Sequence, residues 1–188
     1  TTMRLLVIFS LLALASCSVV PNSVHQGQSI GFEGMLYDSL DVETTVSGST
    51  STANVDDASS FGIRYEAFNS ESTSILFGLT AREYDAADAT ELSIGARMYT
   101  SPDASLQPFF QGTFAGSSGW DIGGITSDTY FSAGIGAGMA WFFSPNSSAE
   151  VGLRYDTFVV APEWTDTGVL TEQDISGTSG WFGISFYF

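Results

Sequence analysis

Residues 179–188, SGWFGISFYF, are the stretch that decides the fold. Bulky apolar side chains occupy every second position, at Phe182, Ile184, Phe186 and Phe188. Successive side chains of a β-strand point to opposite faces, so the segment is predicted to be a strand with one wholly apolar face. The ends of a domain usually carry polar residues and fray in water. This face therefore needs a cover, either a protein core or a bilayer.

The same alternation recurs along most of the chain, with almost no helical period. The 20 glycines and the Ser, Thr, Asn and Asp residues between the apolar runs are typical of a sheet protein with frequent turns. The pattern predicts eight strands, at about residues 35–46, 59–68, 73–84, 90–100, 107–116, 129–143, 148–160 and 176–188.

The connections between these strands alternate in length. Turn-forming residues make short links at 69–72, 101–106 and 144–148. Longer links are expected at residues 48–57, 84–89, 116–128 and 161–177. Short turns at one end and long loops at the other are typical of outer-membrane barrels.

All five basic residues are arginines, and four of them fall on the polar parity of a predicted strand. A soluble sheet would spread lysines over its wet face, but lysine is absent. Guanidinium groups interleaved with carboxylates suit a confined interior, where the two can form bidentate pairs. We therefore predict an inward-facing charge network of Arg64, Glu66, Arg82, Glu91, Arg97, Glu150, Arg154 and Asp156.

Strand number, loop asymmetry and the terminal alternation together resemble the small eight-stranded barrels of bacterial outer membranes, the OmpA transmembrane domain and OmpX-like proteins. This resemblance implies an all-β, antiparallel up-and-down transmembrane barrel with both termini periplasmic. It also implies contact with outer-membrane lipid, and recognition of Phe182, Ile184, Phe186 and Phe188 by the barrel-insertion machinery. Phe110, Trp141 and Phe143 are expected in an aromatic girdle. Asp38 fits neither face, which predicts a bulge or a misplaced boundary there.

The N-terminal region carries an export pattern. Arg4 precedes an apolar run that is too short to span a membrane as a helix. Residues 14–17, LASC, resemble the lipobox of bacterial lipoproteins, which implies acylation of Cys17; the alternative is an ordinary signal peptide cut after Ala15. The expected divisions are a signal peptide at 1–16, a lipid-anchored tether at 17–33 and the barrel at 34–188.

Catalysis is not expected from this sequence. Barrel enzymes that use a general base place a histidine near the outer rim, whereas the single histidine, His25, lies in the expected tether. A formal net charge of −16 argues against nucleic-acid binding. The acidic loops are expected to bind divalent cations weakly at most, and neither a cofactor nor a dedicated metal site is predicted.

Three interpretations of the function follow. The first is a monomeric structural or surface-interaction protein with a packed lumen and acidic external loops. The second is a narrow porin-like channel or small-ligand conduit through the lumen. The third is a soluble periplasmic β-barrel lipoprotein, in which the closing strand is buried.

Overall fold

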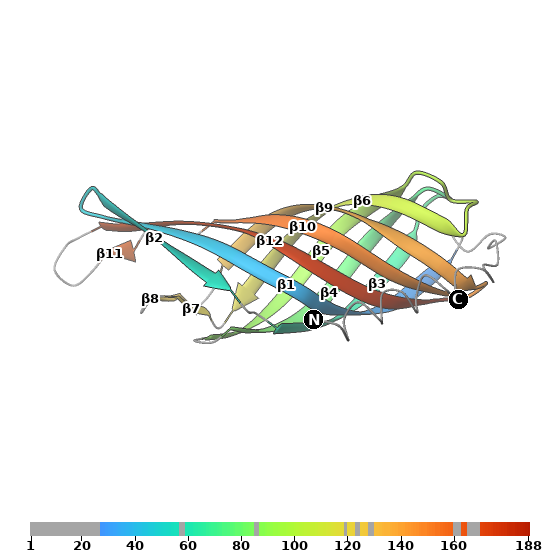
Figure 1. Cartoon of the computed structure of the whole chain (residues 1–188), viewed down its shortest axis with the longest axis horizontal. Coiled ribbons are helices and arrows are strands. Elements are labelled where there is room, and N and C mark those ends of the chain that lie inside the picture. Colours follow the sequence, from blue (N-terminus) through green and yellow to red (C-terminus); the bar gives the residue numbers. More distant parts are fainter. Residues whose placement is uncertain are drawn as a thin grey trace, which may run out of the picture.

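The protein is a closed antiparallel β-barrel in the computed structural model (Figure 1). The structure describes residues 27–56, 59–84, 87–118, 120–122, 125–127, 130–159, 163–164 and 170–188. Eight strands form the wall: β1 (Gln28–Val46), β3 (Ser59–Phe68), β4 (Thr73–Tyr84), β5 (Ala87–Tyr99), β6 (Leu106–Ser118), β9 (Tyr130–Ser144), β10 (Ser147–Val159) and β12 (Leu170–Tyr187). Each pairs with the next in this order, and β12 pairs with β1 to close the barrel. The predicted all-β, eight-stranded fold is therefore confirmed.

Four short strands lie at one end of the barrel: β2 (Ser49–Asp56), β7 (Trp120–Ile122), β8 (Ile125–Ser127) and β11 (Glu163–Trp164). We call this the long-loop end, and the opposite end the short-turn end. Both described chain ends lie at the short-turn end, where the amide and carbonyl of Gln28 exchange hydrogen bonds with Phe188 at 3.0 and 2.9 Å. Among the described residues, no helix is long and apolar enough to cross a membrane.

The first strand differs most from its expected limits. β1 begins at Gln28 instead of near residue 35, so residues 28–33, which the sequence pattern assigned to the tether, belong to the wall. A register shift between Met35 and Tyr37 marks a bulge beside Asp38, where the sequence suggested one. The alternation of Ile30 and Phe32 with smaller or polar residues was the available signal for the earlier start.

The long loops are shorter than expected, because the strands extend into them. The expected loop at 48–57 contains β2, which pairs with β1 over eight rungs. Only residues 85–86 separate β4 from β5, and β12 begins at Leu170 instead of near residue 176. The long-loop end therefore consists largely of strand extensions where the sequence predicted loops.

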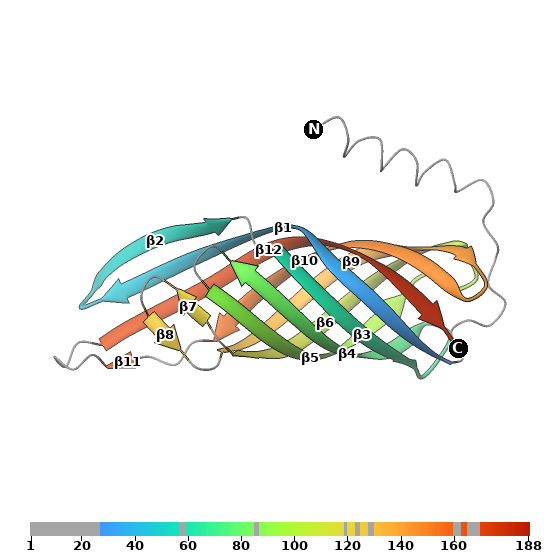
Figure 2. The ribbon, with the colours of Figure 1, turned by 90° about the horizontal axis from the view of Figure 1, so that it is seen from below.

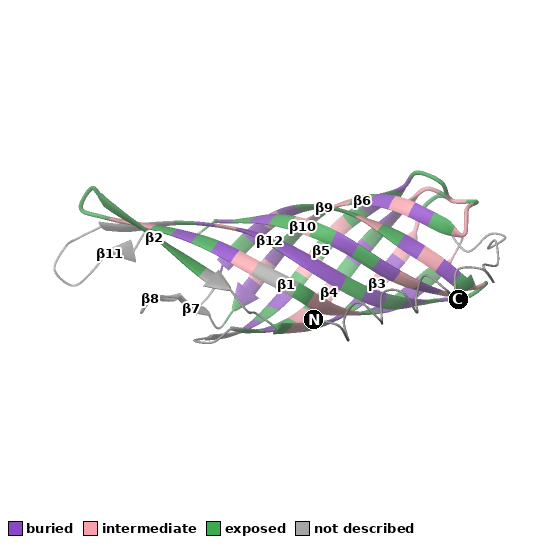
Figure 3. Ribbon diagram, in the orientation of Figure 1, coloured by how far each residue is buried: buried purple, intermediate pink, exposed green. Residues whose placement is uncertain are grey.

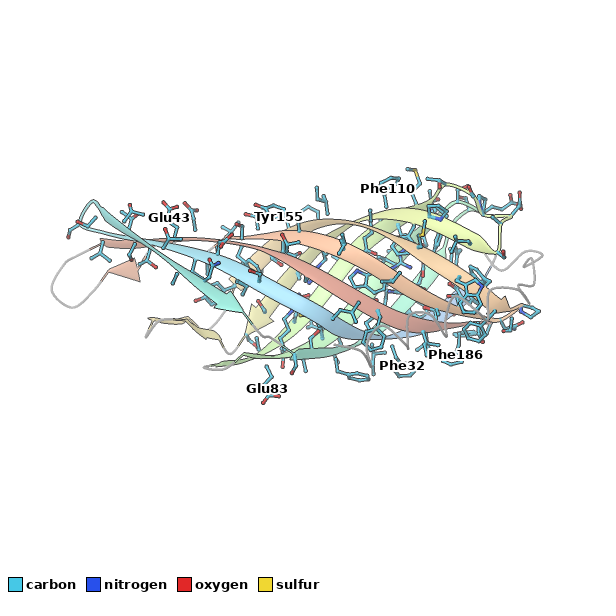
Figure 4. All side chains as sticks on the ribbon, in the orientation of Figure 1. Phe32, Glu43, Glu83, Phe110, Tyr155 and Phe186 are labelled. Atoms are coloured by element: carbon cyan, nitrogen blue, oxygen red, sulfur yellow. The ribbon has the colours of Figure 1, made fainter. Side chains whose placement is uncertain are left out.

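Alternate residues along the wall are buried and exposed, which gives the striped strands of Figure 3. Phe32, Phe110 and Phe186 project outward, as Figure 4 shows. We call the outward apolar side chains of the wall the belt. Nearer the long-loop end, outward positions become acidic, at Glu43 and Glu83. The apolar faces of the strands thus point away from the barrel axis over most of its length.

Candidate functional site: the closed lumen

The inward side chains of β5 mark four layers of the barrel interior, which we call the lumen. Tyr99 lies at the short-turn end, Arg97 is next, Glu91 is farther along, and Ala89 lies towards the long-loop end; all four are buried. Because residues two apart share a face of a strand, one strand samples the whole depth of the lumen. Apolar side chains occupy both end layers and charged ones the two middle layers.

Glu150 organises the first ion-pair cluster, which consists of Glu33, Arg64, Glu66, Arg97 and Glu150. Its Oε2 lies 2.7 Å from Arg64 Nη2 and 2.8 Å from Arg97 Nη1. Arg64 also pairs with Glu33, and Arg97 with Glu66 at 3.5 Å. These residues come from β1, β3, β5 and β10, so the cluster spans the barrel.

Side-chain hydroxyl and amide groups add hydrogen bonds to this cluster. Ser185 donates to Glu150 Oε1 at 2.6 Å, and Tyr99 donates to Glu66 at 2.9 Å. Arg97 donates to the side-chain oxygen of Gln111 at 2.8 Å. A buried charge is tolerated when it is both paired and hydrogen-bonded, and here the interior supplies both.

The second ion-pair cluster consists of Arg82, Glu91, Arg154 and Asp156. Arg82 lies 3.1 Å from Glu91, and Arg154 lies 2.6 Å from Asp156 and 3.7 Å from Glu91. Two arginines thus meet two carboxylates, which balances their formal charges. In the first cluster two arginines meet three carboxylates, so the paired groups together carry one excess negative charge.

Glycines on the inner face make room for these long side chains. A Cβ at Gly134 would lie 2.1 Å from Asp156 Oδ1, and one at Gly152 would lie 2.8 Å from the ring of Trp181. Either contact is closer than a Cβ atom approaches a non-bonded heavy atom in folded proteins. The three glycines of β9 and the single glycine of β10 therefore reflect a crowded lumen.

Aromatic side chains fill the lumen at the short-turn end. Tyr99, Phe109, Phe142, Trp181 and Tyr187 belong to one buried cluster. Phe142 and Tyr187 have ring centroids 5.1 Å apart, and Tyr99 and Phe109 have centroids 5.8 Å apart with an edge-to-face tilt. This layer also contacts the first ion-pair cluster, since Arg97 Cζ lies 3.9 Å from the centroid of the Phe109 ring.

A second apolar layer fills the lumen at the long-loop end. Its members are all at most 5% exposed: Leu40, Val42, Ala89, Tyr130, Phe158 and Ile175. β10 places this layer directly beyond the second cluster, because Phe158 is the next inward residue after Asp156. Charged groups are therefore enclosed between two apolar layers.

The structure places all eight predicted charged residues inside the barrel and gives each arginine a carboxylate within 4 Å. Sequence reasoning missed Glu33, because it fell within the expected tether. It also missed the two apolar layers, since it predicted a polar inner face along the whole barrel. Cys17 and His25 lie outside the described residues, as do the acidic positions 57, 85, 128 and 166.

The terminal residues Phe182, Ile184, Phe186 and Phe188 all face outward and are 44–65% exposed. Phe110 and Phe143 are also exposed near the short-turn end, and the ring of Trp141 lies 5.9 Å from that of Phe143. The aromatic positions expected for a girdle therefore share the outer surface at one end of the barrel.

The pairing in the lumen fills space and offsets all but one of the carboxylate charges of the two clusters. Within the described ranges, no group of three His, Cys, Asp or Glu side chains is arranged to hold a metal ion. The carboxylates of both clusters accept from arginines, so they are held as ion-pair partners instead of being presented to a substrate.

The barrel is similar to solved outer-membrane proteins. It matches neisserial surface protein A with 17% identity and a TM-score of 0.51, over 86% of this chain and 99% of that one. It matches the N-terminal β-barrel domain of Pseudomonas aeruginosa OprF with 20% identity and a TM-score of 0.52, over 87% and 100%. The outer membrane protein OprG of P. aeruginosa matches with 10% identity and a TM-score of 0.51, over 87% and 98%.

No protein-family model and no curated protein matches the sequence. At these identities the likeness shows that the chain has the fold of small outer-membrane barrels. Because one fold hosts many activities, the function has to be argued from the lumen and the surfaces of this chain.

Proposed function

We propose that this protein is a non-enzymatic integral protein of the bacterial outer membrane, whose closed lumen supports a structural or surface-interaction role at the long-loop end. The observation that carries the proposal is the lumen itself, in which two ion-pair clusters lie between two apolar layers. A barrel filled in this way serves as a rigid support.

The belt supports the proposed location. Outward side chains such as Ile94, Ile135 and Leu153 are 51–70% exposed, which in water would be an extended apolar surface. A bilayer covers such a surface, and the polar inner face matches the pattern of transmembrane barrels. This argues against a soluble periplasmic barrel. In the proposed orientation the short-turn end is periplasmic, where a lipid on Cys17 would insert beside β1.

The channel alternative has one observation in its favour. The side chains of Glu33 and Arg154 are 26% and 15% exposed, so the charged layers contain some accessible space. A conducting path would also have to cross both apolar layers, in which Phe142 and Tyr130 are each 0% exposed. We therefore favour a barrel that does not conduct.

Two measurements on the purified protein test the proposal. The folded barrel is expected to migrate faster in unboiled than in boiled detergent gels, and to show no steady conductance in planar bilayers. Mobility that ignores heating, together with extraction by carbonate, would exclude the membrane barrel. Stable single-channel steps would favour the conduit instead.

Acylation is tested separately. Cys17→Ser is expected to abolish incorporation of a labelled fatty acid and to leave heat-dependent mobility unchanged, because the barrel does not need the lipid to close. Unchanged labelling of the variant would show that Cys17 is not the lipid acceptor.

A further inference from the structure

β2 gives the sheet an open edge at the long-loop end. It pairs with β1 on one side, and among the described residues no strand pairs with its other side. β4 pairs with β3 only as far as the Ser59–Glu83 rung. The eight residues of β2 therefore lie beyond the last rung of the β3–β4 pairing. Figure 2 shows β2 at the margin of the barrel, alongside β1. Alternate residues of such a strand direct their amide and carbonyl groups away from the sheet.

The turn before β2 holds this edge in a fixed conformation. Ser47 and Gly48 have φ values of 51° and 82°, the conformation of a two-residue type I′ hairpin turn. The register then runs without a shift from the Val46–Ser49 rung to the end of β2. An edge that is already extended loses little conformational freedom when another strand pairs with it.

Over its first six residues the edge lacks the usual devices that prevent pairing. Natural edge strands are commonly protected by lysine, proline, a bulge or very short length. Residues 49–54, STSTAN, contain neither a charge nor a proline, and the side chains are exposed. β11, at the opposite end of the strand order, has only two residues.

The two faces beside this edge differ in chemistry. Asp41 and Glu43 share the outward face with Thr52, and Glu43 lies directly opposite Asp174 of β12. Like charges on one rung destabilise a sheet, and a cationic group above them would relieve the repulsion. On the inward face the neighbours are small or apolar, with Ala53 paired to Val42.

We propose that the open edge of β2 binds an extended basic peptide segment by strand addition. Main-chain hydrogen bonds supply the pairing, and the long side chains of Lys or Arg at alternate positions reach across β2 towards Asp41 and Glu43, while small apolar residues face inward. The inference rests on the proposed function, because it requires the long-loop end to face the cell exterior.

The probe is a fluorescent octapeptide, Lys-Val-Lys-Thr-Lys-Val-Lys-Thr, with blocked ends, titrated into the full-length protein in detergent micelles. Two twin peptides carry N-methyl groups, one on the four lysines and the other on the four remaining residues. Each twin has lost the amide donors of one edge but keeps the same charge. Strand addition predicts that one twin binds at least 10-fold more weakly than the other, as measured by fluorescence anisotropy. Equal binding of both twins, or no binding of the parent peptide, would overturn the proposal.

The acidic face is tested by a double variant, Asp41→Asn with Glu43→Gln. We expect this variant to bind the parent peptide at least 5-fold more weakly than the unchanged protein does. Asp103→Asn, in the exposed link at the short-turn end, is the matched control and should leave the affinity unchanged. Equal affinities of the double variant and the control would remove the basis for a cationic partner. Heat-dependent mobility is recorded for every sample. If the barrel shows this mobility but the peptide experiment gives the contrary result, the present inference is overturned and the proposed function stands.

Discussion

On β1, Ile30 and Phe32 point out of the barrel, whereas Leu40 and Val42 point into it. All four are even-numbered, and the change of side follows the bulge at residues 35–37, which shifts the register by one residue. A one-residue shift moves every later side chain to the opposite face. The bulge thus places apolar residues outside in the belt and inside at the long-loop end.

On β12 apolar residues also pass from the outer to the inner face, but no bulge is involved. Ile184 is outside and Ser185 inside, but farther along the strand Asp174 is outside and Ile175 inside. Here the parity is constant and the residue types exchange faces. One wall is therefore built for two surroundings, with a lipid-compatible exterior over the belt and the arrangement of a water-soluble sheet at the long-loop end.

The largest effect is expected in the first ion-pair cluster. Arg97→Met removes the arginine that pairs with Glu66 and leaves Glu150 with Arg64 alone, both carboxylates being buried, and should lower the free energy of unfolding by about 3–5 kcal/mol. Urea unfolding in lipid vesicles, followed by heat-dependent mobility, measures the change. Glu43→Gln, at an exposed outward position, is the control and should shift stability by at most about 0.5 kcal/mol. Similar small changes for both variants would mean that the lumen network does not stabilise the barrel.

A positive charge on the outer surface should destabilise the belt more than the long-loop end. Ile94 is an outward residue between Leu92 and Met98, so Ile94→Arg should cost about 2–4 kcal/mol if that face contacts the bilayer interior. Glu43→Arg should be tolerated, since it faces water opposite Asp174. The same unfolding assay compares the two variants. Equal tolerance at both positions would place Ile94 outside the membrane.

The second ion-pair cluster should show pairwise coupling. Arg154→Met leaves Asp156 without its nearest cation at 2.6 Å, so Asp156→Asn should restore part of the lost stability. A double-mutant cycle is expected to give a coupling energy of about 0.5–3 kcal/mol. The same cycle between Arg154 and Glu150 should give almost none, because Glu150 pairs with Arg64 and Arg97. Coupling to Glu150 instead of Asp156 would contradict the two-cluster arrangement.

The belt and the charged lumen were predictable because each follows from a short-range rule. A period of two assigns each strand residue to a face, and the absence of lysine leaves arginines such as Arg64 and Arg97 with an interior role. The partner of Arg154 was not predictable, since Glu150 and Asp156 share its face and the choice depends on strands that meet only in the closed barrel.

The long-loop end was less predictable for a physical reason. Residues 48–57 contain Gly, Ser, Thr, Asn and Asp, which are typical of loops, yet residues 49–56 form β2 because β1 offers a partner beyond the belt. Tertiary pairing here overrides local propensity. The inward burial of Phe158 was equally hidden, because its neighbours Asp156 and Arg154 on the same face are charged.

The smallest effect gives the cleanest comparison, since one substitution can be made twice on one strand. Ile175 is 2% exposed in the apolar layer of the long-loop end, and Ile184 is 44% exposed in the belt. Ile→Val removes one methylene at either place, but only in a packed core does it leave a cavity, which makes Ile175→Val cost about 0.5–1.5 kcal/mol. At Ile184 a fluid acyl chain can fill the space, so we expect a change below about 0.5 kcal/mol. Chemical unfolding of the two variants in vesicles of one lipid composition measures the difference. Equal losses would show that the belt packs as tightly against its surroundings as the enclosed layer does. The contrast between the outward belt and the enclosed apolar layer would then fail.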